Sequence, residues 1–428
     1  MGASTFPVTV FVLGTSRDCG KTVASIGIIS KLLSGDYGYA PDEIGYMKPV
    51  GQDARRVTDA QGQPAVAERD AILVTGLLGL PMCAPADVSP VLWSSGRTED
   101  CIDASCCGNP RQVRDAYLAR IGAAYCRVAR GKQIMVMEGT GQLGVGSVGG
   151  VSGGEVSGLL RAMGVPLRLV MVVRGEGVGG LEHMVPHILM LEHLGERLDG
   201  VIVNRVPREA GQEVTSRVAR YIGNVFPILY PLRCQESGCP RVLGYVPDMP
   251  ELSLPTMRLV AEHFAAQAGA GLEVLTPLGR APDDTALIRR VMVVSLEQGY
   301  EEHLADGDAV IVGINSNARL VSLLEYHVRA RQRGRPGLAG LILSCRSVGG
   351  LLPMLRTMLE RSGLPVLALD WDSAEIAAQL HHLVVKIQPY DEAKRALIAQ
   401  AYCAALTGLA TLVPPARARA RRATVSAE

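Results

Sequence analysis

The sequence predicts an α/β fold, built on a parallel β-sheet and followed by a second, smaller α/β domain. Short, almost wholly apolar segments alternate with longer segments of helical periodicity, which is the pattern of strands buried on both faces and joined by helices. Glycine is abundant, at 48 of 428 residues, and aromatic residues make up only 4%. This composition suits a fold with many tight strand-to-helix turns.

The length, charge and cysteine content narrow the class of protein further. A chain of 428 residues is long enough for two or three domains with filled cores. Its net charge of +1 predicts no nucleic-acid or membrane partner. Without a long apolar run or a signal-peptide pattern, the chain is expected to be cytoplasmic, with reduced thiols. The ten cysteines lack zinc-site spacing, since Cys234 and Cys239 have no second pair.

The alternation of elements is clear through the first 246 residues. Gly-rich residues 139–154 are expected to form a loop whose backbone approaches another group. Residues 81–110 are expected to form a long irregular loop, of the kind that covers a substrate or regulates access. The predicted strands are 8–14, 44–50, 133–137, 167–173, 199–203 and 243–246, and the predicted helices are 21–33, 70–80, 111–130 and 181–194.

The turn after the first strand predicts a phosphate-binding loop. Gly14 is followed by five residues and then by Gly20, Lys21 and Thr22, which open a helix. Glycines let the backbone N–H groups and the helix N-terminus face an anion, while Lys21 would reach the outer phosphates and Thr22 would hold Mg²⁺. The alternative is an ordinary glycine-containing turn with a surface lysine. The position between a strand and a helix favours phosphate binding.

Three further polar residues lie at or just beyond the carboxyl ends of predicted strands: Lys48, Glu138 and Asn204. Ligands of parallel sheets bind beyond the carboxyl ends of the strands, so these side chains are expected to converge there. Glu138 suits a metal ligand or a carboxylate that orients water, although a helix cap or a solvated carboxylate is the alternative. Lys48 is equally compatible with a surface lysine, and Asn204 with the end of a strand in a turn.

A proline-rich break at about residues 247–282 separates the second domain. The predicted division is a nucleotide-binding domain at 1–265, a linker at 266–282, a second α/β domain at 283–410 and a tail at 411–428. The tail is predicted to be disordered and solvated, rather than a nucleic-acid-binding arm; its arginines are Arg417, Arg419, Arg421 and Arg422.

The second domain repeats the alternation on a smaller scale. Its turns at 313–317 and at Gly349-Gly350 are candidate ligand sites, and ordinary turns are an equally good interpretation. The predicted strands are 309–313, 338–344 and 365–369, and the predicted helices are 318–333, 350–362, 373–382 and 391–406.

The first domain resembles dethiobiotin synthetase and its relatives, whose phosphate-binding loop is lengthened in the same way. The resemblance rests on GTSRDCGKT at 14–22, KPV at 48–50 and EGTG at 138–141. More closely, the chain resembles the dethiobiotin-synthetase-like domain of long phosphate acetyltransferases, through KPVGQ at 48–52, SPV at 89–91, GRT at 96–98 and EGTGQLGVGSV at 138–148. Residues 270–406 are similar to the DRTGG domain that follows in those proteins.

This resemblance implies ATP and Mg²⁺ as cofactors and assigns roles to residues. Asn204 would recognise the base, and Thr22, Asp70 and Glu138 would ligate Mg²⁺. Lys21, Lys48 and Glu138 would be the catalytic residues of any phosphoryl transfer. The loop residues that would bind the nucleotide are Gly14, Thr15, Asp18, Cys19, Gly20, Lys21, Thr22 and Val23.

Departures from the family pattern limit what the resemblance implies. Gln52 replaces the serine that binds the diamine substrate of dethiobiotin synthetase, and Ser16 replaces an acidic loop residue; both argue against dethiobiotin synthesis. The Gly-Asp-Arg turn common in DRTGG domains is Gly313-Ile314-Asn315 here. Because the sequence ends where the acetyltransferase catalytic domain would begin, no acetyl transfer is expected.

Two functions fit these residues. The first is a regulatory protein that binds MgATP and hydrolyses it slowly, if at all. Its second domain would sense a small metabolite or dock a separate phosphate acetyltransferase, and the resemblance implies a homo-oligomer. The second is an ATP-dependent ligase of the dethiobiotin or cobyrinic-acid amidating type. A scaffold that binds phosphate without turnover is a third interpretation, and the sequence does not separate them.

Overall fold

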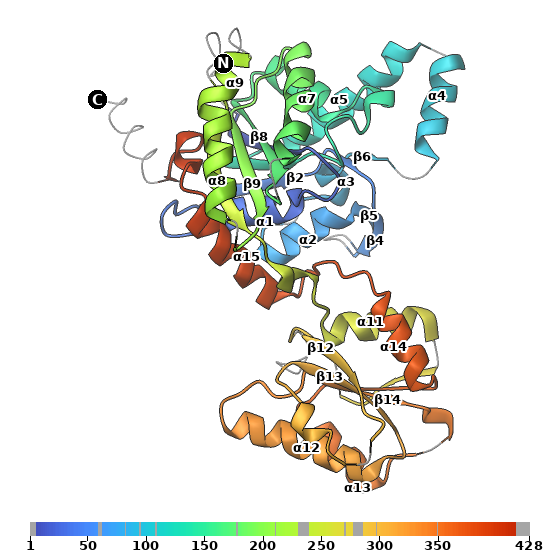
Figure 1. Ribbon diagram of the computed structural model, residues 1–428. Coiled ribbons are helices and arrows are strands. Elements are labelled where there is room, and N and C mark those ends of the chain that lie inside the picture. Colours follow the sequence, from blue (N-terminus) through green and yellow to red (C-terminus); the bar gives the residue numbers. More distant parts are fainter. Residues whose placement is uncertain are drawn as a thin grey trace. The chain divides into compact units, whose positions relative to one another are not determined.

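The chain forms two α/β units, which Figure 1 shows coloured along the sequence. The first unit comprises Met1–Met249 and Arg395–Glu428, and the second comprises Pro250–Lys394. The computed structural model describes residues 6–58, 62–81, 83–93, 96–107, 109–176, 179–209, 211–229, 239–268, 271–276, 286–296, 298–348 and 350–416.

The first unit is built on a six-stranded sheet in the order β10-β9-β8-β1-β7-β2. Every pairing in it is parallel. The predicted α/β class with a parallel sheet is therefore confirmed, and β1 lies inside the sheet between β7 and β8. The strands are β1 (Val8–Gly14), β2 (Ile44–Met47), β7 (Ile134–Glu138), β8 (Leu167–Arg174), β9 (Gly200–Val206) and β10 (Arg241–Pro247).

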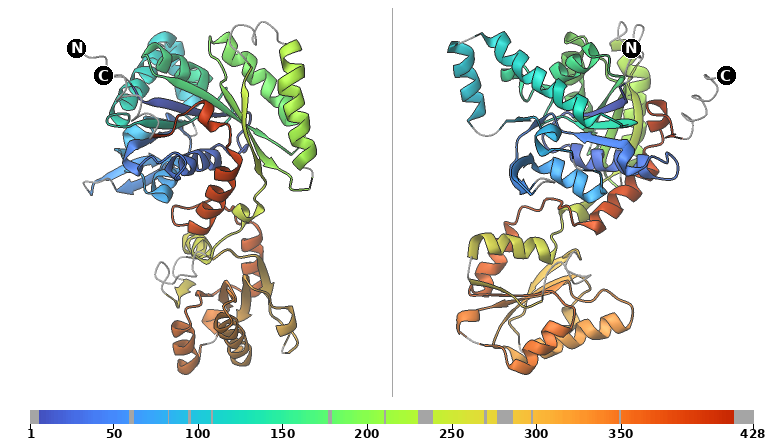
Figure 2. Two further views of the ribbon diagram at one scale, coloured as in Figure 1. Left: turned by 90° about the vertical axis from the view of Figure 1, so that its left-hand side faces the viewer. Right: turned by 180° about the vertical axis from the view of Figure 1, so that it is seen from behind.

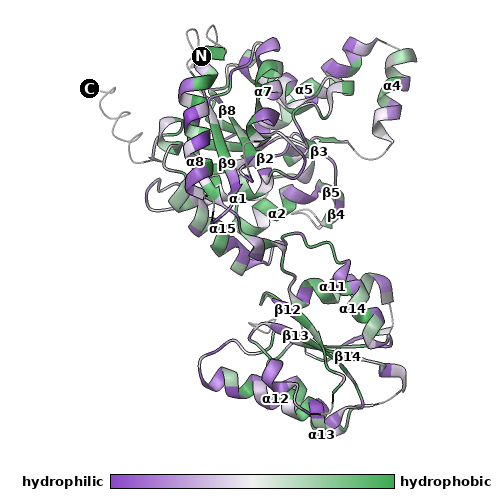
Figure 3. Cartoon of the chain, in the orientation of Figure 1, coloured by the Kyte–Doolittle hydropathy of each residue, from purple (hydrophilic) through white to green (hydrophobic). Residues whose placement is uncertain are grey.

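Helices cover this sheet because its strands are apolar on both faces. All five residues of β7 are buried, as are six of the seven in β1, and Figure 3 shows the strands as hydrophobic and the helices with mixed surfaces. Tyr125 lies fully buried in the core and shares a 2.7 Å hydrogen bond with Thr9 of β1. The helices are α1 (Lys21–Leu33), α2 (Arg69–Leu78), α5 (Pro110–Val128), α6 (Gly153–Ala162), α7 (Gly179–His193), α8 (Gly211–Arg220) and α9 (Phe226–Leu229).

The expectation that residues 81–110 are irregular was wrong. This stretch contains α3 (Pro85–Val88), β6 (Val91–Leu92) and α4 (Arg97–Cys107). β6 pairs with β3 (Val50–Gly51), and the Trp93 indole donates a 3.1 Å hydrogen bond to the Thr98 hydroxyl. These contacts join residues without a shared periodicity, so the pattern of the sequence did not indicate them.

A β-hairpin of β4 (Ala54–Thr58) and β5 (Pro64–Glu68) precedes α2. Neither of these two strands is among those that the sequence predicted. Most of its side chains are exposed, so the hairpin lacks the apolar alternation that marks a half-buried strand.

The second unit contains a five-stranded sheet in the order β11-β15-β14-β13-β12, in which only β11 is antiparallel to its neighbour. The predicted strands became β13 (Asp308–Gly313), β14 (Gly340–Ser344) and β15 (Val366–Leu369). The edge strands β11 (Leu272–Val274) and β12 (Arg290–Val293) were not predicted, because neither has a fully buried residue. The helices are α11 (Met257–Ala268), α12 (Asn317–Gln332), α13 (Pro353–Arg361) and α14 (Ser373–His381).

The structure divides the chain differently from the predicted boundaries, because the chain returns to the first unit. Most of α15 (Glu392–Ala405), which the sequence had placed in the second domain, packs on α1 of the first unit (Figure 2). Beyond it, the Gly408 amide donates a 2.9 Å hydrogen bond to the Leu243 carbonyl of β10. Residues 417–428 of the predicted tail lie outside the described residues.

No helix in the described part of the chain combines the length and apolar character needed to cross a membrane.

Candidate functional site

The loop between β1 and α1 curls around the side chain of Lys21. The Lys21 ammonium donates hydrogen bonds to the carbonyl oxygens of Ser16, at 2.9 Å, and Arg17, at 3.3 Å. Gly20 has a φ of +92°, a left-handed conformation that residues with a Cβ rarely adopt. The enclosed lysine and the left-handed Gly20 agree with the glycine and lysine spacing, and phosphate binding at this loop stays a prediction.

The N-terminus of α1 presents free hydrogen-bond donors. No side chain caps this end of the helix. Within the described residues, the backbone N–H groups of Gly20, Lys21, Thr22 and Val23 donate no hydrogen bond. The Ser16 hydroxyl is also buried without a partner. Unpaired N–H groups at a helix N-terminus, beside an ammonium group, form a site suited to an anion.

Glu138 lies beside the first turn of α1. The Thr22 hydroxyl donates a 2.8 Å hydrogen bond to Glu138 Oε1, and the Tyr46 hydroxyl donates one of the same length to Oε2. Glu138 ends β7, which pairs with both β1 and β2, so the sheet brings the three residues together. Burial and the Glu138 charge raise the pKa of Tyr46 well above its usual value. Tyr46 is therefore a donor to the carboxylate at every physiological pH.

Lys48 lies among three carboxylates and is not a surface lysine. Its ammonium is 3.2 Å from Glu68 Oε1 and 3.4 Å from Glu138 Oε1, and it forms a hydrogen bond with Asp70. Burial acts to lower the pKa of Lys48, but the Glu138, Asp70 and Glu68 charges outweigh it and raise this pKa. We call these residues, Lys48, Glu68, Asp70 and Glu138, the carboxylate cluster.

Glu68 is the member of the carboxylate cluster that sequence reasoning missed. It precedes α2 and accepts hydrogen bonds from the backbone N–H groups of Asp70, at 2.7 Å, and Ala71, at 3.1 Å. The sequence offered little signal, because Glu68 lies two residues before the predicted helix 70–80 and glutamate is not among the usual N-cap residues. Burial and the Asp70 charge raise the pKa of Glu68 to about 7, against the opposing effect of Lys48.

This raised pKa predicts how Glu68→Gln changes stability with pH. Between the ordinary glutamate pKa of 4.5 and about 7, the folded protein keeps a proton that the unfolded chain has lost. The free energy of unfolding of the wild type should therefore fall as the pH rises from 5 to 8, by up to about 3 kcal/mol from this group.

Glutamine cannot titrate, so the stability of Glu68→Gln relative to the wild type should increase over that range. Urea denaturation at pH 5 and pH 8 measures this difference. A difference that stays constant, or that shrinks as the pH rises, would show that Glu68 is ionised throughout.

Asn204 meets the loop from the end of β9. Its amide nitrogen donates a 2.9 Å hydrogen bond to the Cys19 carbonyl, and its amide oxygen accepts a 3.1 Å hydrogen bond from the Tyr402 hydroxyl. Only 3% of Asn204 is exposed. Tyr402 belongs to α15, far along the chain, and no sequence pattern linked it to the loop.

The Thr22 and Glu138 oxygens are spaced like two neighbouring ligands of Mg²⁺. Adjacent ligands of an octahedral Mg²⁺ lie about 2.9 Å apart, and the Thr22 and Glu138 oxygens are separated by 2.8 Å. Asp70, the third predicted ligand, contacts Lys48. The described residues include no group of three or more His, Cys, Asp or Glu able to hold a metal. Cys234, one of the cysteines considered for zinc, lies outside the described residues.

The second unit has polar residues at the ends of its parallel strands. The Ser344 and Ser373 hydroxyls share a 2.8 Å hydrogen bond. Arg346 pairs with Asp370 at 3.2 Å and with Glu273 at 3.5 Å. Asn315, in the first predicted turn, is exposed. Gly349, in the second predicted turn, lies outside the described residues.

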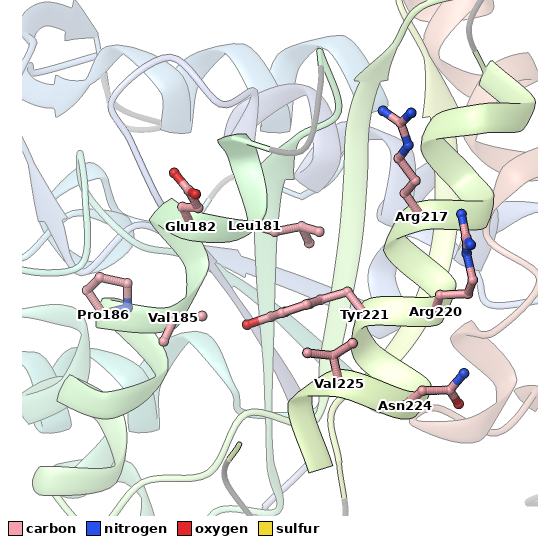
Figure 4. A pocket seen from close by; sticks show the side chains of 9 residues that line it. All are labelled: Leu181, Glu182, Val185, Pro186, Arg217, Arg220, Tyr221, Asn224 and Val225. Carbon is pink, nitrogen blue, oxygen red and sulfur yellow. The ribbon is translucent and has the colours of Figure 1, made fainter. Parts of the chain in front are cut away.

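A cavity of about 770 Å³ lies between α7 and α8 in the first unit. Figure 4 shows the Tyr221 ring extending towards α7, while Arg217 and Arg220 point along the side of α8. Tyr221 belongs to a π-helical turn, Tyr221–Val225. None of the predicted site residues lines this cavity. Its walls are mainly apolar, formed by Leu181, Val185, Pro186, Tyr221 and Val225, with Glu182, Arg217, Arg220 and Asn224 at the sides.

No protein-family model matches the sequence, and no curated protein matches it. Among solved structures, one similar chain contains the CBS and DRTGG domains of the regulatory region of Clostridium perfringens pyrophosphatase, complexed with the activator diadenosine tetraphosphate. It is 14% identical, with a TM-score of 0.22, over 33% of this chain and 50% of that chain.

Another similar structure is the signal recognition particle receptor FtsY from Elizabethkingia anophelis in complex with GDP. It is 10% identical, with a TM-score of 0.29, over 58% of this chain and 60% of that chain. The aligned part thus spans 50% of the pyrophosphatase chain and 60% of the FtsY chain. Likenesses at this level carry no information about function, so the assignment to the α/β class rests on the sheet topology itself.

Proposed function

We propose that the first unit binds a Mg²⁺–nucleoside triphosphate, with ATP as the nucleotide, and that the protein acts as a nucleotide-dependent regulator. The observation that carries this proposal is the convergence of three features at the start of α1. These are the unpaired N–H groups, the Lys21 ammonium, and the Thr22 hydroxyl beside the Glu138 carboxylate. Each suits a different part of a metal-bound triphosphate.

The roles of the residues follow from their positions. Lys21, which now bonds to two loop carbonyls, would exchange these partners for the outer phosphates. Thr22 and Glu138 would hold Mg²⁺, which would neutralise charge that develops on the transferred phosphoryl group. Tyr46 and Lys48 fix the Glu138 carboxylate through its two oxygens. Asp70 faces the same lysine and completes the proposed metal-binding set.

Asn204 would contribute to base recognition through the hydrogen-bonding groups of its amide that its present partners leave unused. A primary amide has two N–H donors and two lone pairs on its oxygen. One donor is used by Cys19 and one lone pair by Tyr402. A donor and an acceptor therefore remain, which is the pair that an asparagine presents to the edge of an adenine.

The regulatory part of the proposal rests on the resemblance to the non-catalytic half of phosphate acetyltransferases. In this proposal the second unit senses a small metabolite or docks a separate phosphate acetyltransferase, and the protein is a homo-oligomer. The second unit has polar residues at its strand ends, namely Ser344, Arg346 and Asp370. They support a ligand site in this unit, because ligands of parallel sheets bind beyond the carboxyl ends of the strands.

Calorimetric titration of the full chain with ATP, in the presence and absence of Mg²⁺, tests the proposal. We expect saturable binding that Mg²⁺ strengthens, with slow phosphate release. If no nucleoside triphosphate binds at millimolar concentration, the proposal is wrong. Release of phosphate that is strongly stimulated by a diamine with bicarbonate, or by a carboxylate with glutamine, would instead favour the ligase.

The metal site is tested separately by Thr22→Val, which removes the hydroxyl while keeping the shape of the side chain. We expect Mg²⁺ to strengthen ATP binding at least tenfold less in this variant than in the wild type, because one inner ligand is lost. Thr75→Val is the matched control, since the Thr75 hydroxyl bonds to the Ala71 carbonyl within α2. An unchanged Mg²⁺ effect in Thr22→Val would exclude Thr22 as a ligand.

A further inference from the structure

Tyr402 lies in α15 and packs against α1, the helix that follows the phosphate-binding loop. Its ring is completely buried and lies directly against Gly27 of α1, where an added Cβ would be only 2.1 Å from the ring. One residue further along, the Cys403 carbonyl accepts a 2.9 Å hydrogen bond from the Lys31 ammonium of α1. Two contacts with α1, one of the Tyr402 ring and one of the neighbouring Cys403 carbonyl, thus hold Tyr402 within the first unit.

A chain of two hydrogen bonds leads from Tyr402 to the loop. The Tyr402 hydroxyl donates to the Asn204 amide oxygen, and the Asn204 amide nitrogen donates to the Cys19 carbonyl. Burial raises the pKa of Tyr402 far above its usual value, so the phenol keeps its proton and acts as the donor. The amide oxygen faces this hydroxyl, and the amide nitrogen faces the Cys19 carbonyl, which can only accept a hydrogen bond.

Asn204 in turn determines the path of the loop just before Lys21. An added Cβ on Gly20 would lie 2.2 Å from the Asn204 amide nitrogen. The amide thus packs against Gly20 while it holds the carbonyl of the preceding residue. Rotation of the amide about its last side-chain bond would place its oxygen against the Cys19 carbonyl oxygen, and two acceptors repel each other.

We propose that Tyr402 is a positioning residue for the phosphate-binding loop, and that its hydroxyl orients Asn204 so that Cys19 and Gly20 keep the shape that receives a phosphate. This inference rests on the proposed function, because it names a determinant of affinity at the same site. It makes α15 an integral part of nucleotide binding, although Tyr402 follows the whole second unit in the sequence.

Tyr402→Phe in the full-length protein tests the inference, since it removes one oxygen atom and leaves the buried ring. We expect the dissociation constant of inorganic tripolyphosphate to rise about three- to tenfold, the value of one hydrogen bond. That of MgATP should rise by at least as much, because Asn204 is also the proposed contact of the base. Tripolyphosphate has no base, so its response reports on the loop alone. If ATP binding weakens while tripolyphosphate binding does not, the effect is on the base and the inference is wrong.

A double-mutant cycle with Asn204→Ala tests whether Tyr402 acts through Asn204. In that background Tyr402→Phe should cause no further loss of affinity, since the oriented amide is already absent. An equal loss in both backgrounds would overturn the inference.

Tyr125→Phe is the matched control for loss of a buried hydroxyl. Tyr125 bonds to Thr9 in the core of the same unit, so this variant should lose stability without any change in nucleotide affinity. If the wild type binds no triphosphate, the proposed function itself fails. If the wild type binds triphosphate and Tyr402→Phe binds it equally well, only the role of Tyr402 is wrong.

Discussion

Lys48→Ala should destabilise the protein by about 3–5 kcal/mol at pH 8, the usual cost of removing one partner from a buried ion pair. Lys48, Glu68 and Glu138 have side chains that are 7%, 2% and 1% exposed. Without the lysine, these two carboxylates and Asp70 face one another with little water to screen their repulsion. Urea denaturation of wild type and variant at pH 8 measures the loss.

The pH dependence of this loss identifies its cause. Without the ammonium, the carboxylates should bind protons more readily, so acid relieves the repulsion and the loss should be smaller at pH 5 than at pH 8. Adding Glu68→Gln to Lys48→Ala should recover part of the stability at pH 8, because it removes one of the opposed charges and keeps an oxygen to cap α2.

Lys132→Ala is the control for loss of a lysine elsewhere in the first unit. The Lys132 ammonium bonds to a backbone carbonyl, that of Asp42, so its removal should change stability by less than about 1 kcal/mol at either pH. A loss in Lys48→Ala that is equally large at pH 5 and pH 8 would mean that packing, and not charge, is the main contribution of Lys48.

Lys21→Ala should weaken MgATP binding by about a hundredfold or more. The Lys21 ammonium is the cation held inside the loop, and hydrogen bonds to charged groups contribute about 1.5–3 kcal/mol each. Binding of inorganic tripolyphosphate should weaken to a similar extent, because the lysine acts on phosphate and not on the base. Calorimetric titration measures both affinities.

The free energy of unfolding of Lys21→Ala distinguishes weaker nucleotide binding from misfolding. The variant loses two bonds to loop carbonyls, so its free energy of unfolding should change far less than that of Lys48→Ala. Lys132→Ala again serves as control and should bind MgATP like the wild type. An affinity for ATP that is unchanged in Lys21→Ala would exclude the loop as the phosphate site.

The local elements of this protein could be read from its sequence because their determinants are local. Apolar runs predicted the inner strands of both sheets, such as β1, β8 and β13, since a strand covered on both faces needs apolar residues throughout. Gly14, Gly20 and Lys21 predicted the loop, because its shape depends on backbone freedom within a few residues. Glu138 and Lys48 were expected at the sheet edge, and the sheet does bring them together.

The tertiary structure alone decided the contacts between residues far apart in the sequence, because no periodic pattern connects such residues. α4 and the β4–β5 hairpin were missed because their exposed faces lack an apolar pattern. Glu68 joined the carboxylate cluster through the fold of the hairpin and α2, and its raised pKa is a property of burial. Tyr402 reaches Asn204 across 198 positions of sequence. Such contacts depend on which surfaces the fold buries against one another, and this depends on the whole chain, so no segment specifies them by itself.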